Sequence, residues 1–200
     1  MQETRMFYTP LWQTTMVETE PRWTLMRQAM LDKIGQLLHS ERSVAKTNFG
    51  GWQSAADLYK HPEFAWLMQR ILERANEVAV NFSREKRFDD GVMWANVNGQ
   101  YNFNAMHIHA DALISGVIYL KVARDDQGLI QFFDSREGSP TSYWRCFSQL
   151  PEETEMTQGV VTVAPREGDI LLFPGWLKHW VTPNLTEDMR VSVSFNLTMS

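Results

Sequence analysis

Residues 179–196 read HWVTPNLTEDMRVSVSFN and contain a histidine, a turn-rich centre and an arginine that begins an alternating run. The Pro, Asn and Asp residues of the centre indicate that the chain reverses there. The stretch predicts a hairpin about Asn184-Leu185, in which His179 lies opposite Arg190 on one face of a sheet. Taken alone, that polar face suits an amphipathic strand in water. The two-residue period of a strand adds three polar residues to it: Ser192, Ser194 and Asn196.

The size and composition of the chain fit a single domain spanning residues 1–200. The 200 residues are 44% hydrophobic, which is enough for a full core. The net charge of −5 gives no reason to expect a nucleic-acid partner. Cys146 is the only cysteine, so an internal disulfide and a thiolate zinc site are excluded. Without a secretory leader or a membrane-length apolar run, we expect a cytoplasmic protein, and a homodimer is the base-rate expectation.

Hydrophobic periodicity predicts helices in the first half of the chain and strands in the second. Residues 21–39 and 62–82 have the spacing of amphipathic helices. Eight short apolar runs follow from residue 92: MWANV, MHIHA, SGVIYLKV, LIQFF, VVTVA, DILLF, HWVT and RVSVSFNL. This spacing predicts a sandwich or a jelly roll over residues 92–200, with residues 1–91 as mostly helical support covering one sheet. The gap at residues 136–157 is interpreted as a lid or substrate loop.

Histidines in the strand half form a candidate metal site. His107, His109 and Asp111 alternate along one predicted strand, so their side chains are expected on one side of it. A His-x-carboxylate pair with a distant histidine, here His179, is the ligand set of non-haem Fe(II) oxygenases. We favour His109, Asp111 and His179 as ligands, because a carboxylate suits Fe(II) among imidazoles. His107 either replaces Asp111 as the third ligand of a three-histidine site, or contacts a metal ligand or the substrate without binding the metal itself.

With these residues placed, the chain resembles the 2-oxoglutarate- and Fe(II)-dependent oxygenases, and within them a bacterial and phage group of about this size. The likeness covers nearly the whole sequence: residues 7–12, GWQS at 51–54, the block from Asn102 through HIHADALISGVIYL, GDILLFPGWLKHWVTPN and RVSVSFN. The resemblance implies a mainly β fold with N-terminal helices, namely a double-stranded β-helix, or cupin-like jelly-roll barrel, with the metal at its mouth. A proline usually follows His-x-His in this group. Ala110 and Asp111 stand there instead, which leaves the choice between His107 and Asp111 open.

The same resemblance implies that Arg190 and Ser192 bind the far carboxylate of 2-oxoglutarate. A buried carboxylate needs a permanently charged, bidentate donor, and arginine provides one better than lysine. Tyr119 either adds a hydrogen bond to that carboxylate or is a core tyrosine. Three further residues are candidate substrate contacts, although core or turn roles also suit them: Trp176, Trp144 and Asn98.

The sequence therefore predicts an oxygenase that uses Fe(II), 2-oxoglutarate and O2. The expected reaction is hydroxylation of a small molecule or amino-acid-like substrate, with release of succinate and CO2, and no catalytic side chain is assigned beyond the metal ligands. One alternative is a cupin-like metal enzyme that uses His107, His109 and His179 without 2-oxoglutarate. The other is a jelly-roll binding module without enzymatic activity. No nucleic-acid or membrane partner is expected in any of these cases.

Overall fold

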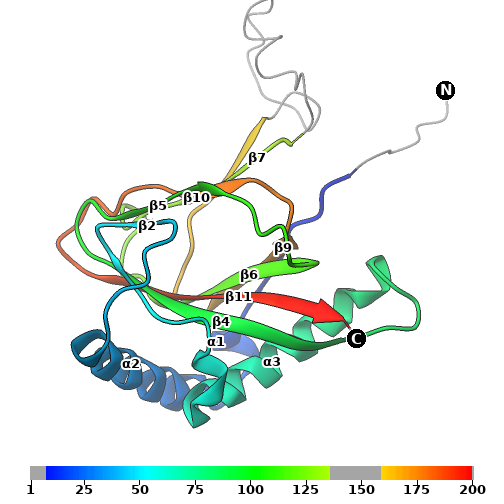
Figure 1. Ribbon diagram of the computed structural model, residues 1–200, viewed down its shortest axis with the longest axis horizontal. Helices are drawn as coiled ribbons and strands as arrows, with labels where there is room; N and C mark the ends of the chain where they lie inside the picture. Colours follow the sequence, from blue (N-terminus) through cyan, green and yellow to red (C-terminus); the bar gives the residue numbers. More distant parts are fainter. Residues whose placement is uncertain (1–7, 136–158, 200) are drawn as a thin grey trace, which may run out of the picture.

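Two antiparallel sheets face each other in the computed structural model, which describes residues 8–135 and 159–199 (Figure 1). The larger sheet has six strands in the order β1 (Trp12–Thr15), β9 (Asp169–Pro174), β6 (Ile114–Lys121), β11 (Arg190–Met199), β4 (Phe88–Asn98) and β3 (Trp52–Gln53). The smaller sheet has five strands in the order β2 (Asn48–Phe49), β5 (Phe103–His107), β10 (His179–Val181), β7 (Ile130–Phe133) and β8 (Val160–Val163). The predicted jelly roll is confirmed, and its architecture is a double-stranded β-helix. The predicted lid or substrate loop, with Trp144, lies outside the described residues.

Helices cover the outer face of the six-stranded sheet (Figure 1). The two long ones are α2 (Trp23–Ser40) and α3 (Pro62–Val78), as the periodicity predicted. Pro62 stands in the first turn of α3, where its missing N–H group is not needed. The short helical elements are α1 (Met16–Thr19), η1 (Leu58–Lys60) and η2 (Ala79–Asn81). In the described part of the chain, no helix is long and apolar enough to cross a membrane.

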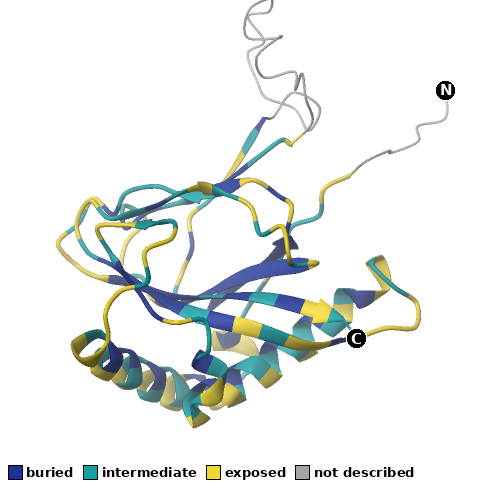
Figure 2. Cartoon of the chain, viewed as in Figure 1, coloured by how far each residue is buried: buried dark blue, intermediate teal, exposed yellow. Residues whose placement is uncertain are grey.

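The strands of the six-stranded sheet sort their side chains between two layers. On β11, Val193 and Phe195 are fully buried in the core shared with the helices, together with Ile34 of α2 and Phe64 of α3. The polar residues that alternate with them, Ser192 and Ser194, line the cavity between the two sheets. The alternation predicted for this strand is thus confirmed. Strand β6 is buried along almost all of its length (Figure 2).

The predicted hairpin between His179 and Arg190 is wrong. Strand β10 pairs with β5 and β7, whereas β11 pairs with β4 and β6, so the chain crosses from one sheet to the other between them. The crossing loop is anchored by Asn184, whose Nδ2 donates to the carbonyl oxygens of Asn98 and Asp188 at 3.0 and 2.7 Å. These hydrogen bonds satisfy the fully buried Asn184 side chain, and they fix the crossing loop in a conformation that is not a hairpin turn.

The predicted strand through His107 and His109 is shorter than expected. Strand β5 ends at His107, and the amide of Ala112 donates to the carbonyl oxygen of His109 at 3.1 Å. That bond closes a four-residue turn, with Asp111 exposed at its third position. Asp111 therefore does not lie on a strand with the two histidines, and the expectation that all three side chains share one strand face does not apply.

Candidate metal centre

Three histidines meet in the space between the sheets. His107, on β5, is the direct partner of His179, on β10, and their ring centroids are 4.3 Å apart. His109, just after β5, brings its ring to 4.8 Å from His107 and 5.2 Å from His179. One ring nitrogen from each residue lies within 4.8 Å of those of the other two. Three imidazoles from two neighbouring strands therefore converge on one point.

Two of these rings are oriented by the backbone. Nδ1 of His107 is 2.7 Å from the carbonyl oxygen of Ala105, and Nδ1 of His179 is 2.8 Å from that of Leu177. A carbonyl oxygen can only accept, so each Nδ1 carries the proton and donates it. Nε2 of each ring keeps its lone pair, as a metal ligand requires.

Burial keeps the three imidazoles uncharged. It lowers the pKa of His179 to about 3, with a smaller contribution from the neighbouring His107. It also lowers the pKa of His109 to about 4, helped by His107 and Lys46. The pKa of His107 is lowered by burial as well. All three are therefore neutral at pH 7, which is the form that binds metals.

The candidate ligand group does not include Asp111. Among the described residues, the group of potential ligand atoms comprises His107, His109 and His179, and Asp111 is exposed in the turn beyond it. The three-histidine set that the sequence left open is the one that the fold brings together. Imidazole nitrogens suit Fe, Zn, Cu and Ni, and three ligands leave coordination positions free. The residues present therefore fit a metal ion that also binds small molecules.

The histidines form one wall of a cavity, and polar residues of the six-stranded sheet form the opposite wall. Arg190 and Ser192 of β11 and Tyr119 of β6 line this cavity together with His107, His109 and His179. Apolar side chains of a buried cluster also line it, among them Val117, Ile130 and Phe173. The three histidines and the residues predicted from the sequence for the cosubstrate thus share one cavity, although they belong to different sheets.

Arg190 is a buried cation whose hydrogen bonds are incomplete. The residue is 1% exposed, and its Nη1 donates to the carbonyl oxygen of Gln127 at 2.9 Å. Its Nε and the hydroxyl of the equally buried Tyr119 have no hydrogen-bond partner among the described residues. Burial lowers the pKa of Arg190, which the nearby Tyr119 partly offsets, and burial raises the pKa of Tyr119 to about 12. An anionic ligand would accept hydrogen bonds from both unsatisfied donors and would balance the buried charge of Arg190.

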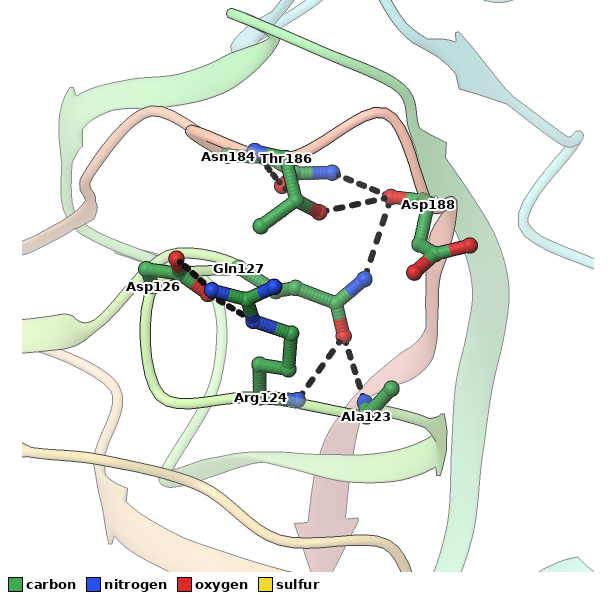
Figure 3. A network of polar contacts seen from close by, with 7 residues as sticks. All are labelled: Ala123, Arg124, Asp126, Gln127, Asn184, Thr186 and Asp188. Carbon is green, nitrogen blue, oxygen red and sulfur yellow. Dashed lines mark hydrogen bonds and ion pairs between the residues drawn. The ribbon is translucent and has the colours of Figure 1, made fainter.

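Two loops behind Arg190 are joined by the side chain of Gln127 (Figure 3). Its Oε1 accepts from the amides of Ala123 and Arg124, and its Nε2 donates to the carbonyl oxygen of Asp188 at 3.1 Å. Asp188 also accepts from Asn184 on the far side of the network. Because the backbone of the same Gln127 binds the guanidinium, this network fixes the position of Arg190.

The backbone next to this network passes close to the guanidinium. Gly128 has a φ of +103°, and a Cβ there would lie 2.6 Å from the carbonyl oxygen of Thr182 and closer still to Nη1 of Arg190. A side chain is therefore excluded by both space and backbone conformation. No role was predicted from the sequence for Gln127 or Gly128, and the glycine between two predicted strands was the one signal available.

Residues 92–196, from β4 to β11, match the family described as "Putative 2OG-Fe(II) oxygenase". The chain belongs to this family. The match includes every candidate ligand and all the predicted cosubstrate contacts of the oxygenase. Among functionally curated proteins, none matches the chain.

Solved structures with the same fold include two prolyl hydroxylases and an epimerase bound to Fe3+ and alpha-ketoglutarate. A prolyl-4-hydroxylase from Pseudomonas putida is 16% identical, with a TM-score of 0.65 over 94% of this chain and 92% of the other. The epimerase SnoN, in complex with Fe3+, alpha-ketoglutarate and nogalamycin RO, is 17% identical, with a TM-score of 0.65 over 94% and 79%. A prolyl hydroxylase from Trichoplax adhaerens, bound to a hypoxia-inducible factor peptide, is 12% identical, with a TM-score of 0.62 over 94% and 82%. At these identities the likeness concerns the fold.

The predicted substrate contacts of the oxygenase do not gather at the cavity. Trp176 is 49% exposed and is not among the lining residues, and Trp144 lies outside the described part of the chain. Asn98 is fully buried and donates to Asn48 Oδ1 at 2.8 Å. The tryptophan that does line the cavity is Trp94, whose ring centroid is 5.7 Å from that of His109. Trp94 lies opposite Ser194 in the register of β4 and β11, and its two-residue spacing from Asn96 was the signal available in the sequence.

Proposed function

We propose that the chain is an Fe(II)- and 2-oxoglutarate-dependent oxygenase in which His107, His109 and His179 hold the iron. The observation that carries this proposal is one cavity with three neutral imidazoles on one wall and the buried, incompletely bonded Arg190 on the other. A metal ion would bind the histidines of the first wall, and a carboxylate would pair with Arg190 on the second. A ligand with a metal-chelating end and a distal carboxylate, such as 2-oxoglutarate, satisfies both at once.

On this proposal, Arg190, Ser192 and Tyr119 bind the distal carboxylate. Arg190 contributes the permanent charge, and its unpaired Nε supplies a charge-assisted hydrogen bond. The pKa of about 12 keeps the Tyr119 hydroxyl protonated, so that it donates to the carboxylate rather than repelling it. Ser192 is the register partner of Tyr119, so its hydroxyl lies beside that donor.

The remaining residues position groups and exclude water. Phe173 packs edge-on against His179, with ring centroids 4.7 Å apart, and lines the cavity. A dry, preorganised site strengthens the interaction of Arg190 with an anion. The chemistry that bound iron and 2-oxoglutarate supply is O2-dependent oxidation of a substrate C–H bond, with succinate and CO2 as co-products.

We infer that the substrate is a small molecule or an amino-acid-like group, and that the simplest outcome is hydroxylation. Proteins of the same fold include prolyl hydroxylases, which supports this outcome, and an epimerase, which shows that the fold also hosts another one. Trp94 beside His109 supplies a flat apolar surface on which such a substrate can pack.

The three-histidine set also fits a cupin-like metal enzyme that uses no 2-oxoglutarate, and calorimetry separates the two. We expect the Fe(II)- or Co(II)-loaded protein to bind 2-oxoglutarate without O2, and to release succinate in air only when Fe(II) and 2-oxoglutarate are both present. Arg190→Lys should weaken binding by about 10–100-fold, since a charge-assisted hydrogen bond contributes about 1.5–3 kcal/mol. The control is Arg124→Lys, which changes an exposed arginine paired with Asp126. Metal binding without 2-oxoglutarate binding would instead support the cupin-like enzyme.

A further inference from the structure

The Nδ1 atom of His109 has a different kind of partner from the Nδ1 atoms of His107 and His179. His107 and His179 turn Nδ1 to backbone carbonyl oxygens, which no substitution of a side chain removes. Nδ1 of His109 instead faces the carboxamide of Asn196, whose Nδ2 lies 3.5 Å away. Asn196 belongs to β11 in the six-stranded sheet, so this ring is oriented from the opposite layer of the fold.

A second hydrogen bond holds this carboxamide in place. Oδ1 of Asn196 accepts from Oγ of Ser115 at 2.8 Å, and Ser115 is 1% exposed at the paired position of β6. Ser115, Asn196 and His109 therefore form a chain of contacts from the buried sheet to the metal centre. Asn196 is the one asparagine that the predicted polar face of β11 contains, and neither the metal nor the cosubstrate proposal uses it.

We propose that Asn196 is a positioning residue for the metal ligand His109, and that it accepts the Nδ1–H hydrogen bond of that ring when Nε2 binds the metal. A neutral imidazole carries one proton, so a ring that ligates through Nε2 must carry it on Nδ1 and needs an acceptor there. A carboxamide offers an oxygen on one side and an NH2 group on the other. Metal binding thus requires Asn196 to present Oδ1 to His109 and Nδ2 to Ser115 Oγ, the reverse of the orientation in this structure.

The hydroxyl of Ser115 makes this exchange feasible. A serine hydroxyl both donates and accepts, so it can bond to either side of the carboxamide. The Asn196 side chain therefore keeps its anchor in both orientations, and one rotation of its amide plane selects the proton position on His109. This inference rests on the proposed metal site and concerns how tightly that site binds its ion.

The test measures Co(II) binding by calorimetry, without 2-oxoglutarate or O2, on the full chain and its variants. Asn196→Leu removes the acceptor while keeping the number and branching of the side-chain heavy atoms, and it should weaken Co(II) binding about 10–100-fold, as loss of such outer hydrogen bonds does in metalloproteins. Asn196→Asp keeps an acceptor and should bind Co(II) at least as tightly as the wild type. Ser115→Ala should cause a smaller loss than Asn196→Leu. The matched control is Thr198→Val, which alters an exposed residue on the same face of β11 and should leave binding unchanged.

Two further readouts separate positioning from folding and from the proposed function. Melting in EDTA should show each variant folded before metal is added. Long-range 1H–15N spectra of the Zn(II)-loaded wild type should show His109 protonated at Nδ1. Equal Co(II) affinity of the wild type and Asn196→Leu, or an equal loss in Asn196→Asp and Asn196→Leu, would overturn the role of Asn196 while leaving the metal site intact. Failure of the wild type to bind Co(II) would overturn the metal site and this inference together.

Discussion

His107 and His179 are direct register partners on neighbouring antiparallel strands, with ring centroids 4.3 Å apart. The same strand pair therefore sets the spacing of two candidate ligands, and each ring is further fixed by a backbone carbonyl oxygen. This arrangement favours His107 over the exposed Asp111 as the partner of His109 and His179.

Comparison of two single substitutions tests which residues form the ligand set. We expect His107→Ala to lower Co(II) affinity by at least about tenfold, because one of three imidazole ligands is lost. Asp111→Ala should bind Co(II) like the wild type, and His61→Ala, at the start of α3, serves as the remote histidine control. Calorimetry of the purified variants measures the difference. The reverse result, with Asp111→Ala impaired and His107→Ala normal, would restore the carboxylate ligand that the sequence favoured.

Gly128→Ala should displace the guanidinium of Arg190. The added methyl group would meet both Nη1 of Arg190 and the carbonyl oxygen of Thr182, and the backbone φ of +103° disfavours any side chain. We expect 2-oxoglutarate affinity to fall about tenfold or more, and stability to fall by about 1–2 kcal/mol. Gly99→Ala is the matched control, since its nearest atom beyond the chain neighbours is 3.5 Å away. Unchanged affinity in Gly128→Ala would show that the guanidinium position is not critical.

Gln127→Ala should loosen the two loops that support Arg190. The variant loses the side-chain hydrogen bonds to Ala123, Arg124 and Asp188 but keeps the backbone carbonyl that binds the guanidinium. We expect a fall of about 1–3 kcal/mol in the free energy of unfolding and weaker 2-oxoglutarate binding, with Co(II) affinity retained. Denaturant titration and calorimetry measure these effects, with Gln36→Ala on the exposed side of α2 as the control. Equal loss of metal and 2-oxoglutarate affinity would indicate general unfolding instead.

Tyr119→Phe should weaken 2-oxoglutarate binding several-fold and change the response of stability to alkaline pH. The folded-state pKa of about 12 lies above the value of about 10 expected in the unfolded chain. The unfolded state then loses its proton first, so the stability that Tyr119 contributes is complete below pH 10 and is lost as the pH rises toward 12. Between these values the wild type should lose up to about 1.4 kcal/mol per pH unit relative to Tyr119→Phe. Parallel pH profiles of the two proteins in denaturant titrations would contradict the raised pKa.

Local patterns in the sequence predicted much of the fold. The alternating residues of β11 identified which side chains face the helices, such as Val193 and Phe195, and which face the cavity, such as Ser192. Period-two alternation depends only on strand geometry and burial, which neighbouring residues encode. The same reasoning placed Arg190 and His179 at one site, although it assigned them to a hairpin that does not exist.

The contacts that set the path of the crossing loop and the exposure of Asp111 are not encoded by neighbouring residues. The path of the loop through Asn184 depends on carbonyl groups of Asn98 and Asp188, and hydrophobic periodicity carries no information about such partners. The exposure of Asp111 depends on a turn closed by the backbone of His109 and Ala112, without a Gly or Pro to signal it. Sequence alone therefore identified candidate ligands and left the choice of the third ligand open.

The candidate metal ligands extend from the five-stranded sheet, whereas Arg190 extends from the six-stranded one. A dicarboxylate held at both ends would consequently act as a crosslink between the two halves of the sandwich. Its binding energy would add to the free energy of unfolding through mass action. Hydrogen exchange should then slow in both sheets together when 2-oxoglutarate joins the metal, and mainly around β5 and β10 when the metal binds alone.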